Sequence, residues 1–224
     1  MPEITLDAEP APLPIELART ALLIIDMQRD FIEENGFGTS LGNDVSRLRA
    51  AIAPCMALLA AARRLGLFVV HTREGHRPDL TDVPRAKLAR GAPNRRIGDR
   101  GPMGRILIRG EPGHEIIPEL TPITGEPVID KSGKGAFHAT DLGSILAIRG
   151  IDSLIVCGVT TEVCVQSTVR EGSDRGYRCV VPADACASYF PAFHASALEM
   201  IKAQGGIFGW VSDSTRVLAG LEGR

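Results

Sequence analysis

Two cysteines stand seven positions apart in the stretch CGVTTEVCVQ, residues 157–166, and a cysteine thiolate is a strong nucleophile. A helix that starts near Thr161 would place Cys164 in its first turn, where the helix dipole favours a thiolate and free backbone N–H groups can bind an oxyanion. Free cysteines are also among the most buried residues, so the local sequence leaves a core role for Cys164 open. Cys157 lies inside an apolar run, which predicts a core residue. The other cysteines have no comparable surroundings: Cys55, Cys179 and Cys186.

A carboxylate and an ammonium group elsewhere in the sequence could activate such a thiol. Asp26 ends the apolar run TALLII, and partial burial there would make it a usable proton shuttle, although it could also pair with an arginine or cap a helix. Lys131 follows PVID and precedes the turn SGKGAF, so it could pair with a carboxylate or lie in solvent. Lys134, on the same turn, could contact a substrate.

Metal and cofactor motifs are missing from the sequence. The stretch HTREGHRPD contains His71, His76, Glu74 and Asp79, but its spacing matches no H-E-x-x-H pattern and no second cluster supports it. The chain has no G-x-x-x-x-G-K-[ST] loop, no G-x-G-x-x-G turn after a strand and no G-x-S-x-G elbow. We therefore expect no metal, no cofactor and no serine nucleophile.

Composition excludes several classes of partner. Of 224 residues, 44% are hydrophobic and 23% charged, which is typical of a globular protein, and the formal net charge of −2 gives no electrostatic case for nucleic acid or an anionic membrane. The N-terminus lacks the basic start and apolar centre of a signal peptide, and no apolar run reaches the roughly 20 residues of a membrane span. With five cysteines and no C-x-x-C pair, these features predict a soluble, cytoplasmic protein with free thiols.

Apolar runs alternate with segments of helical periodicity along most of the chain. This alternation predicts an α/β fold with a mostly parallel sheet, whose strand carboxyl ends gather the reactive groups. Residues 1–19 are Pro-rich and predicted to be an irregular lead-in, residues 20–224 form one domain, and residues 75–122 form a long irregular excursion of the kind that is often functional. Strands are expected within residues 20–26, 67–74, 127–133, 152–159 and 177–188. Helices are expected within residues 44–65, 138–150, 161–175 and 192–206. The helix over residues 44–65 should begin at Asp44 as its N-cap and end at Gly66.

The stretches LLIIDMQRDF, DKSGKGAFHATDL and CGVTTEVCV occur in this order and together resemble the isochorismatase-like family of cysteine hydrolases, over residues 17–218. The resemblance implies a three-layer sandwich with helices on both faces of the sheet, and a homo-oligomer, often a tetramer. It implies a catalytic triad of Asp26, Lys131 and Cys164. It also implies a cis peptide bond between Val159 and Thr160, which would aim the N–H groups of Thr160 and Cys164 at a substrate oxygen.

Within that family, HTREGHRPDL, DKSGKGAF and AQGGIFGW are similar to the biuret and triuret hydrolases. That likeness implies that Phe31, Lys134 and Gln204 line a pocket for a small ureide, from which ammonia is released through a thioester. The Asp-x-His metal site of nicotinamidases is absent, and the presence of Cys164 disfavours vinyl-ether hydrolysis. Other substrates stay open, among them ureidoacrylate, N-carbamoylsarcosine and nicotinamide, as does a non-catalytic binding protein of the same fold.

Overall fold

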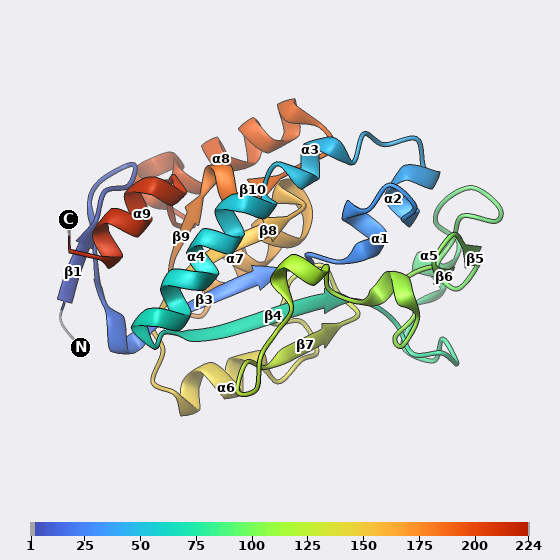
Figure 1. The fold of residues 1–224 in the computed structure, drawn as a ribbon, viewed down its shortest axis with the longest axis horizontal. Helices are drawn as coiled ribbons and strands as arrows, with labels where there is room; N and C mark the ends of the chain where they lie inside the picture. The colour runs from blue at the N-terminus through green and yellow to red at the C-terminus, as the bar shows by residue number, and fades with distance from the viewer. Residues whose placement is uncertain (1–2, 224) are drawn as a thin grey trace.

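A single parallel sheet forms the centre of the molecule (Figure 1). The computed structural model describes residues 3–223. Six strands follow the order β11-β9-β8-β3-β4-β7, and a short seventh strand, β10, also pairs with β8. Every pairing within this sheet is parallel, which confirms the predicted fold class. Its strands are β3 (Thr20–Ile25), β4 (Phe68–Glu74), β7 (Val128–Lys131), β8 (Ser153–Val159), β9 (Arg178–Pro182), β10 (Cys186–Ala187) and β11 (Trp210–Ser212).

The two central strands are continuous apolar runs. All six residues of β3 and all seven of β8 are buried, as expected for strands covered on both faces. In their register Ile24 lies opposite Cys157, which is fully buried and confirmed as a core residue. Both strands stop where polar residues begin, so the end of the apolar run fixes the edge at which functional groups emerge.

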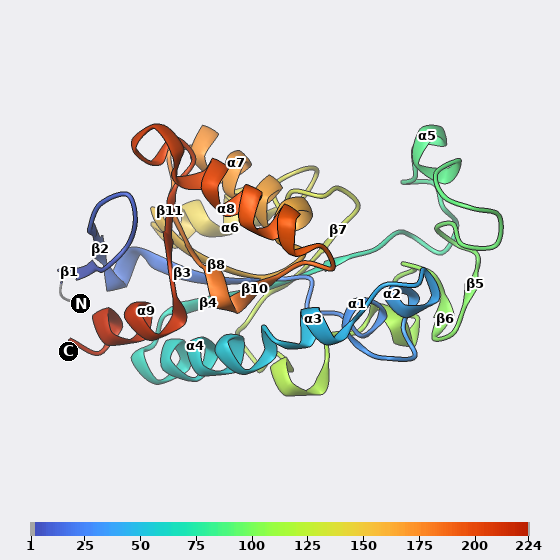
Figure 2. The same cartoon turned by 90° about the horizontal axis from the view of Figure 1, so that it is seen from above.

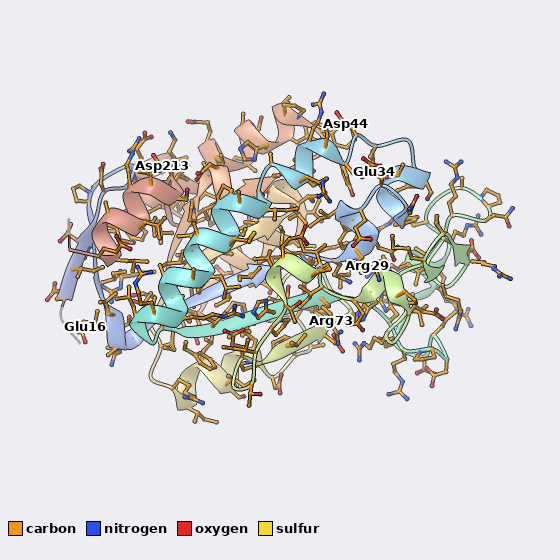
Figure 3. All side chains as sticks on the ribbon, in the orientation of Figure 1. Glu16, Arg29, Glu34, Asp44, Arg73 and Asp213 are labelled. Carbon is orange, nitrogen blue, oxygen red and sulfur yellow. The ribbon has the colours of Figure 1, made fainter. Side chains whose placement is uncertain are left out.

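Helices cover both faces of the sheet (Figure 2). One face carries α4 and α9, and the other carries α6, α7 and α8, which makes the predicted three-layer sandwich. Asp213, labelled in Figure 3, starts α9 by accepting a hydrogen bond from the backbone N–H of Arg216. The helices are α4 (Ile52–Leu65), α6 (Leu142–Ile148), α7 (Gln166–Asp174), α8 (Pro191–Gly206) and α9 (Ser214–Leu221).

The helix expected over residues 44–65 is divided. It forms α3 (Ser46–Arg49) and then α4, and the Asp44 side chain accepts from the N–H of Ser46. Pro54 explains the interruption, because proline has no N–H to donate to the carbonyl four residues earlier and its ring crowds that carbonyl. The predicted stop is confirmed: Gly66 ends α4 in the left-handed conformation, with a φ of 71°.

The predicted irregular lead-in is wrong for the described part of residues 1–19. β1 (Glu3–Leu6) and β2 (Leu13–Glu16) pair as antiparallel strands, followed by a short 3-10 turn (Leu17–Arg19). Leu6, Leu13 and Ile15 are buried and belong to the hydrophobic core. The alternation of buried and exposed residues in LPIE is a strand signal, and the surrounding prolines obscured it.

Most of the excursion over residues 75–122 lies beyond the carboxyl ends of β3 and β4, whereas its last turn, Pro118–Leu120, lies beside α4 (Figures 1 and 2). It holds only short elements, and α1 and α2 lie at the same end of the molecule. Among residues 3–223, no helix is long and apolar enough to cross a membrane. The short elements are α1 (Arg29–Ile32), α2 (Phe37–Ser40), α5 (Arg85–Leu88), β5 (Arg100–Gly101), β6 (Gly104–Arg105) and the 3-10 turns Pro112–His114 and Pro118–Leu120.

The N-terminal hairpin should contribute to stability. Ile15 is 1% exposed, so we expect Ile15→Ala to lower the free energy of unfolding by about 2–5 kcal/mol, measured by urea denaturation. Thr5→Ala, at an exposed position of β1, is the matched control and should change it by less than about 0.5 kcal/mol. Equal, small effects of both substitutions would contradict the placement of Ile15 in the core.

Candidate active site

A fully buried ion pair lies at the carboxyl edge of the sheet. Lys131 Nζ is 2.7 Å from Asp26 Oδ2, and neither side chain is exposed. Burial disfavours the ammonium, yet the nearby charges of Asp26, Cys164 and Glu74 outweigh it and raise the pKa of Lys131. Lys131 is therefore a fixed positive charge in the interior.

Three neighbouring strands position this pair. Asp26 follows β3 with a φ of 49°, and Lys131 is the last residue of β7, with β4 between them. From β4, Thr72 donates its hydroxyl to Asp26 Oδ1 at 2.6 Å. Asp26 Oδ2 is buried, and its contact within the described chain is the ammonium of Lys131. Both oxygens of the carboxylate are therefore held in place.

Cys164 lies in a π-helical turn, Thr161–Val165, that follows β8 and leads into α7. The Val159–Thr160 peptide bond before it is cis, as the family resemblance implied. Cys164 is 4% exposed, and burial raises the pKa of its thiol well above the usual value. The negative charges of Asp26 and Glu74 raise this pKa further, whereas the positive charges of Lys131 and Lys134 lower it. Burial therefore opposes the thiolate that the start of a helix favours, so a neighbouring base is needed to take the thiol proton.

Glu74 completes the cluster, and the sequence pointed to it only as a candidate metal ligand. It ends β4 and is 2% exposed. The Cys164 thiol donates to Glu74 Oε2 at 3.5 Å, while Oε1 lies 2.5 Å from Lys134 Nζ and 3.2 Å from Lys87 Nζ. Burial disfavours the charged carboxylate. This effect is outweighed by the positive charges of Lys134, Lys131 and Lys87, which lower the pKa of Glu74 to about 2. Its position at a strand end next to β3 and β7 is the signal that could have identified it.

The thiol and two carboxylates form one compact group. The Cys164 sulfur and one oxygen each of Asp26 and Glu74 lie within 4.8 Å of one another. Such a set could chelate a metal ion by distance alone, but ammonium groups already contact both carboxylates. The donors therefore fit a metal poorly, and the arrangement is suited to moving a proton from sulfur to oxygen.

The histidines weighed as metal ligands have other contacts. His71 Nε2 lies 3.1 Å from Glu126 Oε2, and His76 Nδ1 lies 3.3 Å from Asp82. Burial lowers the pKa of both imidazoles, so they are neutral. Their ring nitrogens face different acids, so HTREGHRPD does not converge on one site.

Of the three predicted pocket residues, only Lys134 lies in this cluster. Phe31 is partly buried, packs against the core and accepts a hydrogen bond from Tyr189 through its carbonyl. The structure does not bring Gln204 to the site: it is an exposed residue at the non-helical end of α8. The helix runs away from the carboxyl edge (Figure 2), so within this chain Gln204 lies apart from the cluster, and its role in substrate binding stays a prediction.

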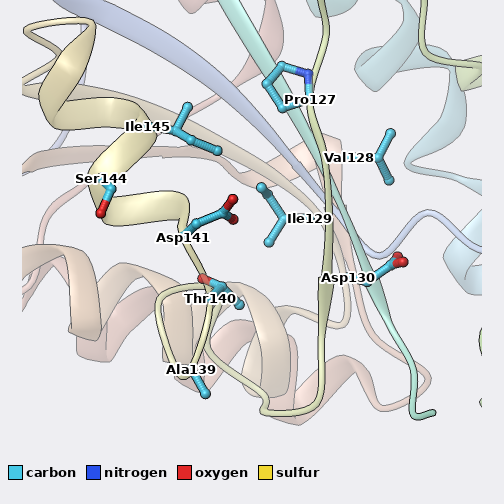
Figure 4. A pocket seen from close by; sticks show the side chains of 9 residues that line it. All are labelled: Pro127, Val128, Ile129, Asp130, Ala139, Thr140, Asp141, Ser144 and Ile145. Carbon is cyan, nitrogen blue, oxygen red and sulfur yellow. The ribbon is translucent and has the colours of Figure 1, made fainter.

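Two hollows differ in their relation to the cluster. A cavity of about 220 Å³ is lined by Glu74, Lys87 and Lys134, and Glu74 also accepts from the Cys164 thiol, so this cavity adjoins the cluster. A depression of about 730 Å³ lies between β7 and α6, where Ile129 points toward α6 and Asp130 points to the other side of the strand (Figure 4). Asp130 pairs with Arg73 and not with the cluster. The smaller cavity is therefore the candidate substrate site.

Comparison with known proteins agrees with this geometry. Residues 20–215 match the family model described as "Isochorismatase domain". The chain belongs to this family. Its sheet and helices resemble a cysteine hydrolase from Pseudomonas syringae pv. phaseolicola 1448A, with a TM-score of 0.81, 29% identity and coverage of 100% of this chain and 99% of the other. The predicted family and fold are confirmed.

Curated relatives include ureidoacrylate amidohydrolases. A RutB protein of Methylorubrum extorquens is 34% identical over 97% of this chain and 89% of its own length. That of Klebsiella pneumoniae (strain 342) is 33% identical over 94% and 90%. N-carbamoylsarcosine amidase from Thermoplasma acidophilum has a TM-score of 0.66 and 25% identity, over 88% of this chain and 96% of its own. These relatives are amidohydrolases, and none of them is named for biuret or triuret.

The charge on Glu74 should be visible in acid denaturation. Because its folded pKa of about 2 lies below the ordinary value near 4.5, its contribution is present above pH 4.5 and is lost as pH falls toward 2. We expect Glu74→Gln to flatten the pH dependence of unfolding free energy in that window by a few kcal/mol, measured by urea titrations at several pH values. Glu34→Gln, at an exposed glutamate (Figure 3), is the control and should keep the wild-type slope. An unchanged slope in Glu74→Gln would contradict the assigned ion pairs.

Proposed function

We propose that this protein is a cysteine-dependent amidohydrolase that cleaves a terminal carbamoyl C–N bond of a small ureido compound, with ureidoacrylate the leading substrate. The observation that carries the proposal is the buried thiol of Cys164 beside the Asp26–Lys131 ion pair. The name of the RutB relatives supports ureidoacrylate.

The first step would be proton transfer from Cys164 to Asp26. Burial raises the pKa of the thiol, so a base must take its proton, and one oxygen of Asp26 lies within 4.8 Å of the sulfur. Lys131 holds Asp26 in place and supplies a positive charge next to the forming thiolate. Thr72, bound to the other oxygen of Asp26, restricts rotation of the carboxylate.

The thiolate would then attack the carbamoyl carbon. Negative charge moves to the carbonyl oxygen, and the backbone N–H groups of Thr160 and Cys164 are the proposed donors that stabilise it. Collapse of this intermediate breaks the C–N bond, and the proton held by Asp26 passes to the leaving amine, so ammonia departs while the acyl group stays on sulfur.

Hydrolysis of the thioester would complete the cycle. Asp26, again unprotonated, accepts a proton from water as the water oxygen attacks the acyl carbon. The carbon–sulfur bond breaks, the proton returns to Cys164, and a carbamate leaves. Since one carboxylate serves both half-reactions, loss of Asp26, Lys131 or Cys164 should remove most of the rate, and their effects should not add.

Biuret and triuret are the second candidate substrates. They are supported by the motifs HTREGHRPDL and DKSGKGAF and by the position of Lys134 at the cluster. That support is weaker, because Gln204 is remote within the chain and Lys134 is engaged by Glu74. Parallel assays of ammonia release from ureidoacrylate, biuret, triuret and N-carbamoylsarcosine separate the candidates, and we expect ureidoacrylate to be the best.

Replacing the nucleophile tests the chemistry. Cys164→Ser should lower kcat by at least about a thousandfold while leaving the melting temperature nearly unchanged, because a hydroxyl near neutral pH is a far weaker nucleophile than a thiolate. The matched control, Cys157→Ala, alters a core thiol seven residues away and should lower stability but not kcat.

Ordinary activity in Cys164→Ser would overturn the assignment of the nucleophile. No hydrolysis of any ureide by the wild type, combined with no alkylation of Cys164 by iodoacetamide, would favour a non-catalytic binding protein.

A further inference from the structure

The cavity beside Glu74 carries a marked excess of positive charge. Apolar side chains form part of its wall, namely Phe37, Leu41, Ile97 and Leu107. Five cationic residues line it, Lys87, Arg90, Arg95, Arg96 and Lys134, against the single acid Glu74, so the lining has a net charge of five minus one, or plus four. The whole chain, in contrast, has a formal net charge of −2.

The three arginines of this lining have no acidic partner within residues 3–223. Glu74 is already engaged by Lys87 and Lys134, and no ion pair joins a carboxylate to Arg90, Arg95 or Arg96. The guanidinium of Arg96 donates only through Nε, to the carbonyl of Gly91. Other arginines of the protein do have acidic partners, including Arg63, Arg73 and Arg178. Uncompensated charge is therefore concentrated where the cavity opens.

The positively charged cavity adjoins the cluster around Cys164. Glu74 both lines the cavity and accepts from the Cys164 thiol, so one residue links the wall that carries the arginines to the sulfur. Gly91, with a φ of 95°, turns the chain between Arg90 and Arg95, which returns this segment to the cavity wall. The guanidinium is suited to binding a carboxylate through two parallel hydrogen bonds.

We propose that Arg90, Arg95 and Arg96 form a subsite for a carboxylate on the substrate, at the end opposite the carbamoyl group that meets Cys164. This inference rests on the proposed amidohydrolase function and specifies its substrate class: ureido acids, and not neutral ureides such as biuret. Glu74 and its lysines separate the two ends, and the apolar wall packs the short carbon chain that joins them.

Binding measurements test the subsite without turnover. In the Cys164→Ser protein, 3-ureidopropionate should bind about 10- to 100-fold more tightly by calorimetry than 3-ureidopropionamide, which has the same shape but no charge. Its affinity should also fall as salt rises from about 50 to about 500 mM, since the pairing is electrostatic. Equal affinities for the two compounds would overturn the proposal.

Substitutions identify the residues. Arg95→Gln and Arg96→Gln should each raise KM for ureidoacrylate about tenfold or more, with little change in kcat and none in the affinity for the neutral amide. Arg85→Gln is the matched control, because Arg85 belongs to the same segment but does not line the cavity. Equal losses with charged and neutral compounds, or an effect of Arg85→Gln as large as that of Arg95→Gln, would contradict the subsite.

The proposed reaction and the proposed subsite fail in different ways. Charge-dependent binding without hydrolysis of any ureide would refute the reaction and leave the subsite intact. Hydrolysis of biuret as efficient as that of ureidoacrylate would refute the subsite and leave the reaction intact.

Discussion

The buried pair of Asp26 and Lys131 is the interaction on which the rest of this structure depends. Removing two charges from water costs several kcal/mol each, so the pair persists only because its geometry is good and neighbouring groups bind the remaining atoms. Thr72 supplies a hydroxyl for Asp26, and the carbonyl of Gly133 accepts from Lys131 at 3.2 Å. The three strands β3, β4 and β7 are the frame that keeps these groups together.

Glu74 extends that pair into a larger cluster of charged groups. Two carboxylates, Asp26 and Glu74, are set against three ammonium groups, Lys87, Lys131 and Lys134, which leaves one net positive charge. Burial, with the charges of Asp26 and Glu74, raises the pKa of the Cys164 thiol, so ionised sulfur needs compensation from its surroundings. The excess positive charge would stabilise the negative charge that develops on sulfur and on the carbonyl oxygen during acylation. Lys87 comes from the excursion over residues 75–122, so this segment contributes one of the positive charges of the cluster.

Much of the fold could be predicted, because β3 and β8 are apolar along their whole length and periodic helices follow the strands. The grouping of Asp26, Lys131 and Cys164 came from the resemblance of three motifs, since spacing in sequence does not determine distance in space. Glu74 was considered only as a metal ligand, because its ion pairs are with lysines 13 and 60 residues away. Gln204 does not reach the cluster within this chain, because its motif lies where α8 ends, far from the carboxyl edge. The homo-oligomer stays a prediction.

Under the proposed function, the cluster and the cavity together explain how one end of the sheet both activates a thiol and selects a substrate. Short, irregular elements of the excursion supply Arg90, Arg95 and Arg96, whereas regular strands supply Asp26 and Lys131. Catalytic geometry thus rests on the rigid sheet, and specificity on loops that tolerate sequence change. On this basis, relatives with the same triad could act on different amides.

The central claim is that Asp26 activates Cys164 for attack on a carbamoyl group. Its most direct test is mass spectrometry of protein quenched in acid within one turnover of ureidoacrylate. We expect an acyl adduct on the Cys164 peptide of the wild type and a strong loss of that adduct in Asp26→Asn. Turnover without any adduct on Cys164, or adduct formation at the wild-type rate in Asp26→Asn, would contradict the claim.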